Sequence, residues 1–492
     1  MYTVSSDYLE AVRQPVVEYY IDGTINDTVE FDNSNIISGS FHITNQCSAT
    51  DDVVLGSVYT GELSCTFCNL QSVQRYTWVD SVIVPYFNLK IDDENYETVP
   101  LGVYTVKEAK HSAEGVMIKA YDNMIKLDEK FDPEKFAVAR KMYGHLQEAC
   151  LACGLTLGMS EYEIQEMTNG NIVIGIVGTA SCTNEEFADH GNDIDTYRDF
   201  IFWAAQTMAC YATADRWGNL VFRQFQNEEH VVDTIEEDYR LQGAVFDDYT
   251  TNYVGFYIMD SQTGGYAYYG YDVEYLTDNI QRTTARLAAV VEEEAELWAA
   301  YQRGDITEEE YNAAVKPLKK LQKKLNKRLD WLRKALEKAQ NSEPGTSMNL
   351  GENPMLQADG VGATQARMRK NVLERLDEIS YTPFTCSTVV GVHYDLGDII
   401  QFTGGHATDE GETCCLMMYD FQMNGEYQMQ GFGVDPITKS TKTATQKGSE
   451  KANKNASNAI IEATGGGGGG GRGAYTTSAF NNIEFVDYTE IS

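Results

Sequence analysis

The sequence predicts a mainly β protein with α+β character: two similar β-barrel domains, a small α/β domain and an inserted antiparallel helical hairpin. Two β-rich blocks near the ends of the chain share a sequence pattern, and an internal repeat constrains a whole architecture. Residues 129–240 change to the spacing of apolar helices, and residues 278–342 contain two long amphipathic stretches. At 492 residues, the chain has room for about three or four domains.

The repeat consists of Leu-Gly, a strand, a polar turn and a second strand that ends in Tyr-Asp. The first block has Leu101-Gly102 and Tyr121-Asp122, and the second has Leu396-Gly397 and Tyr419-Asp420. The spacing from Gly to Tyr is 19 residues in one block and 22 in the other. The pattern favours a duplicated β-domain, although Leu-Gly with alternating apolar residues also recurs by chance.

Residues 1–128 are predicted to form the first barrel, because short alternating strands with polar turns are typical of barrels and sandwiches. The first strand covers residues 16–21, and Asp22-Gly23 is its expected hairpin turn. Further strands are expected at residues 38–44, 81–89, 100–106 and 116–122.

Residues 129–240 are predicted to form the α/β domain. One helix is expected to begin at Pro133 and to reach Cys150, and a second apolar helix covers residues 197–212. Residues 215–219 then form a turn into a strand at 220–225.

Residues 241–277 and 363–435 are assigned to the second barrel, together with a helix at 364–380. Tyrosines gather at 253–271. Cross-strand aromatic packing explains this cluster, and stacking on sugars is the alternative.

Residues 278–342 are predicted to form the helical hairpin. Its turn is Arg303-Gly304-Asp305. Integrin ligands contain the same tripeptide, but a turn between helices explains it without such a function. Thr307 and Glu310 form a capping box at the start of the second helix. Pro317 is expected to kink or interrupt that helix. The acidic run at 292–296 should roughly face the basic run at 316–324.

The remaining segments are predicted to be a loop at 343–362 and a flexible tether with a docking tail at 436–492. Seven consecutive glycines occupy 465–471, and such a tract makes a flexible linker. Residues 480–488 alternate like a strand, which suggests either docking to a partner or a disordered end.

The net charge of −36 argues against specific nucleic-acid binding, which needs basic surface. The same charge suits a wall along which DNA slides, and it also serves solubility. No run is apolar enough for a membrane span, and no secretory signal is expected at the start of the chain.

No catalytic, cofactor-binding or metal-binding residue is predicted. Cys65/Cys68 and Cys150/Cys153 have zinc-like Cys-x-x-Cys spacing, but free buried thiols explain them better. The seven histidines are scattered, and no zinc-protease, nucleophile-elbow, phosphate-loop or dinucleotide motif is present.

Several short motifs resemble tail hub proteins of phages that infect Gram-positive bacteria. They lie at residues 39–46, 55–57, 61–66, 100–104 and 120–124, and the late stretches at 381–384 and 396–400 are similar to the second β-domain of those hubs. The resemblance covers about 1–277 and 363–435. The family that the chain resembles includes the baseplate hub of contractile tails and the N-terminal part of the tail-associated, or tail tip, protein of siphophages.

This resemblance implies a structural, non-enzymatic homotrimer with two barrels per subunit, which joins the six-fold tail tube to the three-fold tail tip and lines the DNA exit channel. Its implied partners are a distal tail or tail tube ring, the tape measure protein and a tail tip or receptor-binding protein at the C-terminal tail. The implied location is the virion tail, assembled in the host cytoplasm. The hairpin at 278–342 departs from the family pattern.

Three alternatives stay open at this point. One is a tail-associated cell-wall hydrolase with a site in 129–240, another is the hub of a contractile bacteriocin or injection system, and the third is a surface adhesin that uses the tyrosine cluster.

Overall fold

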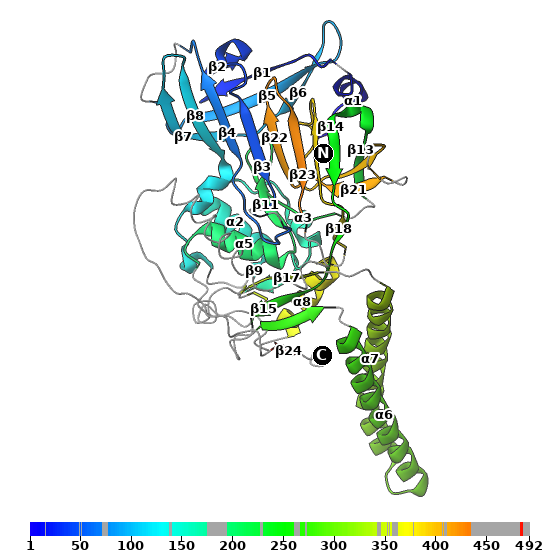
Figure 1. Cartoon of the computed structure of the whole chain (residues 1–492). Helices are drawn as coiled ribbons and strands as arrows, with labels where there is room; N and C mark the ends of the chain where they lie inside the picture. The colour runs from blue at the N-terminus through cyan, green and yellow to red at the C-terminus, as the bar shows by residue number, and fades with distance from the viewer. Residues whose placement is uncertain are drawn as a thin grey trace.

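The computed structural model has a large sheet at one end, a mixed helical region below it and a long helical hairpin (Figure 1). It describes residues 1–14, 16–48, 50, 52–70, 77–136, 140–174, 194–226, 230–259, 266–270, 273–341, 346–351, 353, 355–356, 363–376, 378–405, 407, 411–433 and 483–485. The strands and helices in these residues confirm the predicted mainly β fold with α+β character.

The main sheet has twelve strands and curls into a half-barrel. Its strands from the first half of the chain are β1 (Tyr19–Ile25), β2 (Val29–Asp32), β3 (His42–Gln46), β4 (Glu62–Phe67), β5 (Val82–Lys90), β6 (Tyr96–Pro100), β7 (Tyr104–His111) and β8 (Val116–Asp122). The others are β14 (Arg240–Phe246), β19 (Phe384–Thr388), β22 (Met418–Gln422) and β23 (Tyr427–Gly431). The strand order is β14-β19-β23-β22-β3-β4-β8-β7-β5-β1-β2, with β6 on β5.

The two β-rich blocks, which are residues 1–128 and residues 363–435 of the predicted barrels, meet inside this sheet. Strand β3 pairs antiparallel with β22, from Gln46 opposite Met418 to His42 opposite Gln422. Their side chains also share one hydrophobic core, which contains Phe31 and Phe87 from the first block and Phe384 from the second. The division into two barrel domains stays a prediction, and the structure adds that the two blocks form one continuous sheet.

The first hairpin turn was predicted wrongly. Asp22 and Gly23 lie in the middle of β1, and the chain turns at Asn26 and Asp27, which have φ of 53° and 55°. Gly23 is required for close packing, because a Cβ atom there would lie 2.4 Å from the carbonyl oxygen of Val84.

The repeat is only partly reflected in three dimensions. Gly102 and Gly397 both have positive φ, and the carbonyl of each preceding leucine accepts a hydrogen bond from a buried tyrosine hydroxyl, at 2.9 Å and 2.6 Å. The second block then differs, because β20 (Ile399–Thr403) pairs with β21 (Glu412–Cys415), and Tyr419 lies in the following strand β22.

The middle region contains the helices and small sheets of residues 123–226. They are η2 (Asn123–Asp128), η3 (Pro133–Phe136), β9 (Arg140–Lys141), α2 (Met142–Ala152), α3 (Glu161–Glu166), β10 (Val173–Ile174), α5 (Tyr197–Thr207), β11 (Tyr211–Ala214) and β12 (Leu220–Arg223). Two short elements of the first half, α1 (Ser6–Val12) and η1 (Asn33–Asn35), lie beside the main sheet.

Both predicted helices in this region are shorter than expected. The first begins at Met142, because residues from Pro133 form only a 3₁₀ turn before the short strand β9. The second ends at Thr207, and Ala209 with φ of 50° reverses the chain into β11. The predicted turn at 215–219 is confirmed, since Asp215 accepts hydrogen bonds from the backbone amides of Trp217 and Asn219.

Two further sheets complete the body. One contains β13 (Val231–Glu236), β20 and β21, with η5 (Glu237–Tyr239) after β13, and the other contains β15 (Thr251–Met259), β16 (Tyr266–Gly270), β17 (Thr346–Asn349), β18 (Ser380–Tyr381) and β24 (Ile483–Phe485). Helix α8 (Ala363–Leu376) packs against the second of these sheets. Tyr257 lies opposite Tyr268 with ring centroids 5.0 Å apart, which confirms cross-strand packing in the tyrosine cluster.

A second hydrophobic core lies below the main sheet. It joins Phe200 of α5 to Tyr253 of β15 and to Leu373 of α8. Buried side chains of β15, β16 and α8 therefore share a core with the predicted α/β region.

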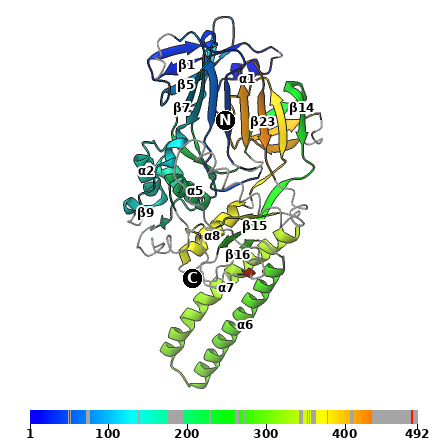
Figure 2. The ribbon, with the colours of Figure 1, turned by 60° about the vertical axis from the view of Figure 1, so that its left-hand side comes forward.

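The predicted helical hairpin is confirmed. Helices α6 (Val273–Arg303) and α7 (Glu308–Asn341) lie side by side and extend away from the body in both views (Figure 2). The Thr307 hydroxyl accepts a hydrogen bond from the Glu310 amide at 3.3 Å, and the Glu310 carboxylate accepts one from the Thr307 amide at 2.8 Å, so the capping box is confirmed as well.

Helix α7 is not interrupted at Pro317. Pro317 and Ala313 are both exposed, so water can satisfy the Ala313 carbonyl that lacks its helical donor. The expected pairing of acidic and basic runs is present at one described contact, where the Lys319 ammonium lies 3.8 Å from the Glu294 carboxylate.

The expected loop at 343–362 and the tether and tail at 436–492 lie mostly outside the described residues. In the tail, β24 is described, and it pairs in parallel with β16 of the same chain, from Ile483 opposite Tyr266 to Phe485 opposite Tyr268.

Candidate functional site

A partly buried cluster of charges lies where three regions of the chain meet. Arg216, in the turn between β11 and β12, donates to the carbonyl of Pro100 at 2.8 Å and to the carbonyl of Tyr394 at 3.0 Å. Its guanidinium also lies 2.9 Å from the carboxylate of Asp395. One side chain thus joins the end of β6, the middle region and the loop before β20.

Asp395 is the centre of this charge cluster. Its other carboxylate oxygen lies 3.3 Å from Arg223 and 3.4 Å from the amino group of Met1, which also binds Asp398 at 2.6 Å. Burial opposes ionisation of Asp395, but Arg216 and Arg223 outweigh it, so the pKa of that carboxyl lies below its usual value. The cluster has the features of a structural joint, because its charges are paired with one another.

A second joint surrounds Arg198 of α5. Its guanidinium lies 2.5 Å from the Asp128 carboxylate, and it donates to the carbonyls of Val58 and Met124 at 2.7 Å and 2.8 Å. Nearby, Asp122 accepts hydrogen bonds from the amides of Gly61 and Met124, yet burial raises its pKa to about 7. These contacts attach the main sheet to the middle region.

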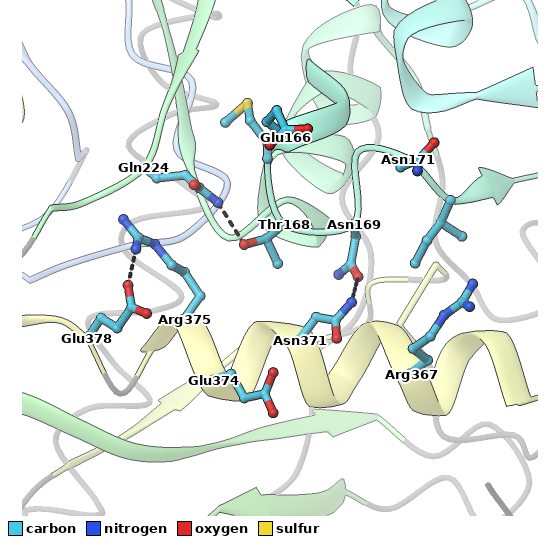
Figure 3. A pocket seen from close by; sticks show the side chains of 12 residues that line it. Glu166, Thr168, Asn169, Asn171, Gln224, Arg367, Asn371, Glu374, Arg375 and Glu378 are labelled. Atoms are coloured by element: carbon cyan, nitrogen blue, oxygen red, sulfur yellow. Dashed lines mark hydrogen bonds and ion pairs between the residues drawn. The ribbon is translucent and has the colours of Figure 1, made fainter. Parts of the chain in front are cut away.

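A pocket of about 660 Å³ opens between the loop after α3 and helix α8 (Figure 3). Figure 3 shows polar side chains that face one another across it: Gln224 donates to Thr168 at 2.8 Å, and Asn371 donates to Asn169 at 2.8 Å. Arg375 is paired with Glu378, and Arg367 lines the pocket from the start of α8.

The carboxylates of Glu166, Glu374 and Glu378 are the acidic groups in the lining of this pocket, and glycoside hydrolysis uses a pair of carboxylates. The pocket's described lining residues include no histidine, cysteine, serine or aspartate. Among the described lining residues, Thr168 has a hydroxyl that could act as a nucleophile. A nucleophilic hydroxyl needs a neighbouring base, whereas the Thr168 hydroxyl accepts a hydrogen bond from the side-chain amide of Gln224, which is not a base. Residues 175–193, a part of the region in which a hydrolase site was considered, lie outside the described residues.

The cysteines behave as buried thiols, as predicted. Cys65, Cys150 and Cys153 are free and buried, and Cys68 is half-buried. Burial raises the pKa of Cys65 and of Cys150 to about 12 and that of Cys153 to about 11. Within the described part of the chain, no cluster of three or more potential metal ligands occurs.

Two of the histidines are buried and pack against aromatic rings. His145 is fully buried, with its ring stacked 5.8 Å from Phe136. Burial lowers the pKa of His393 to about 3, so this ring is neutral where Tyr8 packs against it at 5.4 Å. His406 lies outside the described residues.

The ends of the main sheet are the surfaces that sequence reasoning missed. Strands β14 and β2 end the strand order, and each is paired on one side within the described residues. On β14, Leu241 is 51% exposed and Val245 is 65% exposed. Exposed apolar side chains on an edge strand are typical of a surface that pairs with another chain. The sequence places residues 241–277 in the second barrel but predicts no bounds for a strand at 241–246, so it does not identify this edge.

No described helix is both long enough and apolar enough to cross a membrane.

Comparison with known proteins gave no match to a family model and none to a curated protein. Among solved structures, the chain is similar to the 43 kDa tail protein of prophage MuSo2 from Shewanella oneidensis. That alignment has a TM-score of 0.40 and 10% identity, and it covers 85% of this chain and 99% of the other.

Two further similar structures are virion baseplates of phage P2 in the activated conformation. One, described as a topological model, aligns with a TM-score of 0.25 and 7% identity. The other, with calcium, has a TM-score of 0.23 and 8% identity. Both alignments cover 85% of this chain and 98% of the compared chain. Because TM-scores below 0.5 do not establish a common fold, we base the function below on the residues and geometry of this chain.

Proposed function

We propose that this chain is a structural protein of a phage tail, and that it acts there as a homotrimeric baseplate hub. The main support is the pairing of β3 with β22, which joins the two β-rich blocks into one twelve-stranded sheet. A chain that carries two β-blocks in one sheet offers six such blocks when three copies assemble. Six blocks on a three-fold axis match the six-fold tail tube and the three-fold tip.

The open geometry of the sheet supports self-assembly. Within the described residues, β14 and β2 are each paired on one side only, which leaves backbone donors and acceptors that another copy can satisfy. Leu241 and Val245 would become buried in such a contact. When β14 of each copy pairs with β2 of its neighbour, the contact is head-to-tail. Three copies related by 120° rotations then close into a ring.

The electrostatics suit a channel through which DNA passes. The chain carries 74 acidic and 38 basic residues, so a ring of three copies has a net charge of about −108, three times the −36 of one chain. Acidic walls repel phosphate and let DNA slide without binding. In this role the ring contacts a tail tube ring on one face and a tail tip protein on the other.

The test is the mass and shape of the full-length protein in solution. Light scattering after size exclusion should give three times the 55.0 kDa of one chain, and negative-stain images should show a three-fold ring with a central opening. A monomer at all concentrations, or a closed particle without an opening, would overturn the proposal.

Edge variants make the test specific. Leu241→Lys with Val245→Lys places charges on β14 and should release monomers, whereas Val79→Lys, at a residue 52% exposed in the turn before β5, should leave the mass unchanged. A zymogram on Gram-positive cell walls addresses the hydrolase alternative, because a structural hub leaves no clearing.

A further inference from the structure

The helical hairpin presents a side face that its own two helices leave exposed. Val290 of α6 and Val315 and Leu325 of α7 are buried between the helices, with exposed fractions of 6%, 4% and 6%. At about 100° per residue, Val291 and Trp298 lie together on the flank of α6, roughly a quarter turn from that contact. They are 47% and 49% exposed, and exposed Ala288 and Ala295 continue the stripe.

Trp298 is held firmly in this stripe although half of its surface is exposed. Its ring lies 5.7 Å from Tyr301 and 5.5 Å from Tyr311 of α7, and these two tyrosines stack at 5.3 Å. A rigid, half-exposed tryptophan near the turn of a projecting hairpin is typical of an interface anchor.

The wall of α7 beside this stripe is basic. The Lys319 ammonium lies 3.8 Å from Glu294, whose carboxylate is on the side of α6 that faces α7. Lys323, one turn further along α7, is exposed, as are Asn326 and Arg333. The stripe and these side chains therefore form one continuous face, apolar on α6 and basic on α7, which we call the hairpin groove.

The same hairpin also carries a surface that complements the groove. The outer flank of α6 presents Ala285, Ala289, Glu292 and Glu296, all exposed, at the three- and four-residue spacing of one helical ridge. Alanines let a helix approach closely, and two glutamates one turn apart match the spacing of Lys319 and Lys323. We call this surface the acidic ridge.

We propose that the hairpin groove of one copy binds the acidic ridge of α6 from a second copy of this chain. The inference rests on the proposed homotrimer, and it assigns to the hairpin the task of joining neighbouring subunits away from the main sheet. Groove and ridge are different surfaces, so the contact is head-to-tail and closes around three copies as the ring does. The hairpin then acts as a clamp between subunits.

A charge-reversal cycle on the full-length protein tests this contact. Lys319→Glu with Lys323→Glu changes the groove, and Glu292→Lys with Glu296→Lys changes the ridge. Each pair alone should raise the concentration at which trimers dissociate by about tenfold or more, because like charges then face one another. The variant with all four changes should return this dissociation concentration to that of the wild type. Mass photometry and sedimentation at several concentrations measure the effect, and circular dichroism checks that the hairpin stays helical.

The matched control is Lys110→Glu with Lys130→Glu, which makes the same charge change at two exposed positions outside the hairpin. It should leave assembly unchanged. If the wild type is a trimer and neither reversal affects it, or if the control weakens it equally, the hairpin contact is wrong and the hub proposal stands. If the wild type is a monomer at every concentration, both proposals fail.

Discussion

Replacing Arg216 by alanine should loosen the junction of three chain regions. The guanidinium forms two hydrogen bonds to backbone carbonyls, those of Pro100 and Tyr394, and an ion pair with Asp395. The Arg216 and Asp395 side chains are 14% and 18% exposed, so solvent screens the pair only in part.

The expected loss can be worked out from these contacts. Breaking one partner of a buried ion pair costs about 3–5 kcal/mol, and each hydrogen bond from a charged donor contributes about 1.5–3 kcal/mol. Asp395 keeps Arg223 and the Met1 amino group as partners, which places the loss near the lower end. We expect about 3 kcal/mol, or roughly a hundredfold in the local opening equilibrium.

Amide hydrogen exchange is the suitable assay, because it reports local opening in a chain too large for simple two-state unfolding. Amides of β11, β12 and the segment around Tyr394 should exchange about a hundredfold faster in Arg216→Ala. The control is Arg303→Ala, whose partner Asp305 is 57% exposed, and its loss should stay below about 1 kcal/mol. Equal effects of the two variants would refute the structural role of the junction.

Three other perturbations follow from the same contacts. Gly23→Ala places a Cβ atom 2.4 Å from the Val84 carbonyl oxygen and should lower the urea midpoint by the equivalent of about 2 kcal/mol. Thr307→Ala removes the cap of α7 and should lower hairpin stability by about 1 kcal/mol in hydrogen exchange. Burial raises the pKa of Asp122 to about 7, so its contribution is present at low pH and is lost as the pH rises through 7. Stability should fall by roughly 1 kcal/mol between pH 6 and 8 in the wild type and stay level in Asp122→Asn.

The sequence predicted elements well where one local signal determines them. The hairpin at 278–342 has a strong helical period and a capping box, and the structure contains both. The sequence led to a wrong prediction where one residue type can serve either a turn or a close contact between strands. Gly23 was interpreted as a turn residue, but the turn lies at Asn26-Asp27, and Gly23 serves a contact with Val84, 61 residues away in the sequence.

The joints and the sheet edge could not be predicted, because their partners are remote in the sequence. Arg216 lies in a polar turn, and nothing local indicates that it binds Pro100 and Asp395, which are 116 and 179 residues away. Val245 is one apolar residue in a short segment, and its exposure depends on β14 being the last strand of the sheet. Such features arise from topology, which short-range patterns do not contain.

The pairing of β3 with β22 limits how the proposed hub could change shape. Five consecutive residue pairs connect these strands, and aromatic side chains from both blocks fill the core beneath them. Separating the two blocks would break this ladder and expose the core, which costs far more than sliding one subunit past another. Any opening of the channel during DNA ejection should therefore occur between subunits. A disulfide that links β14 of one copy to β2 of the next should block such opening, whereas one between β3 and β22 should leave it intact.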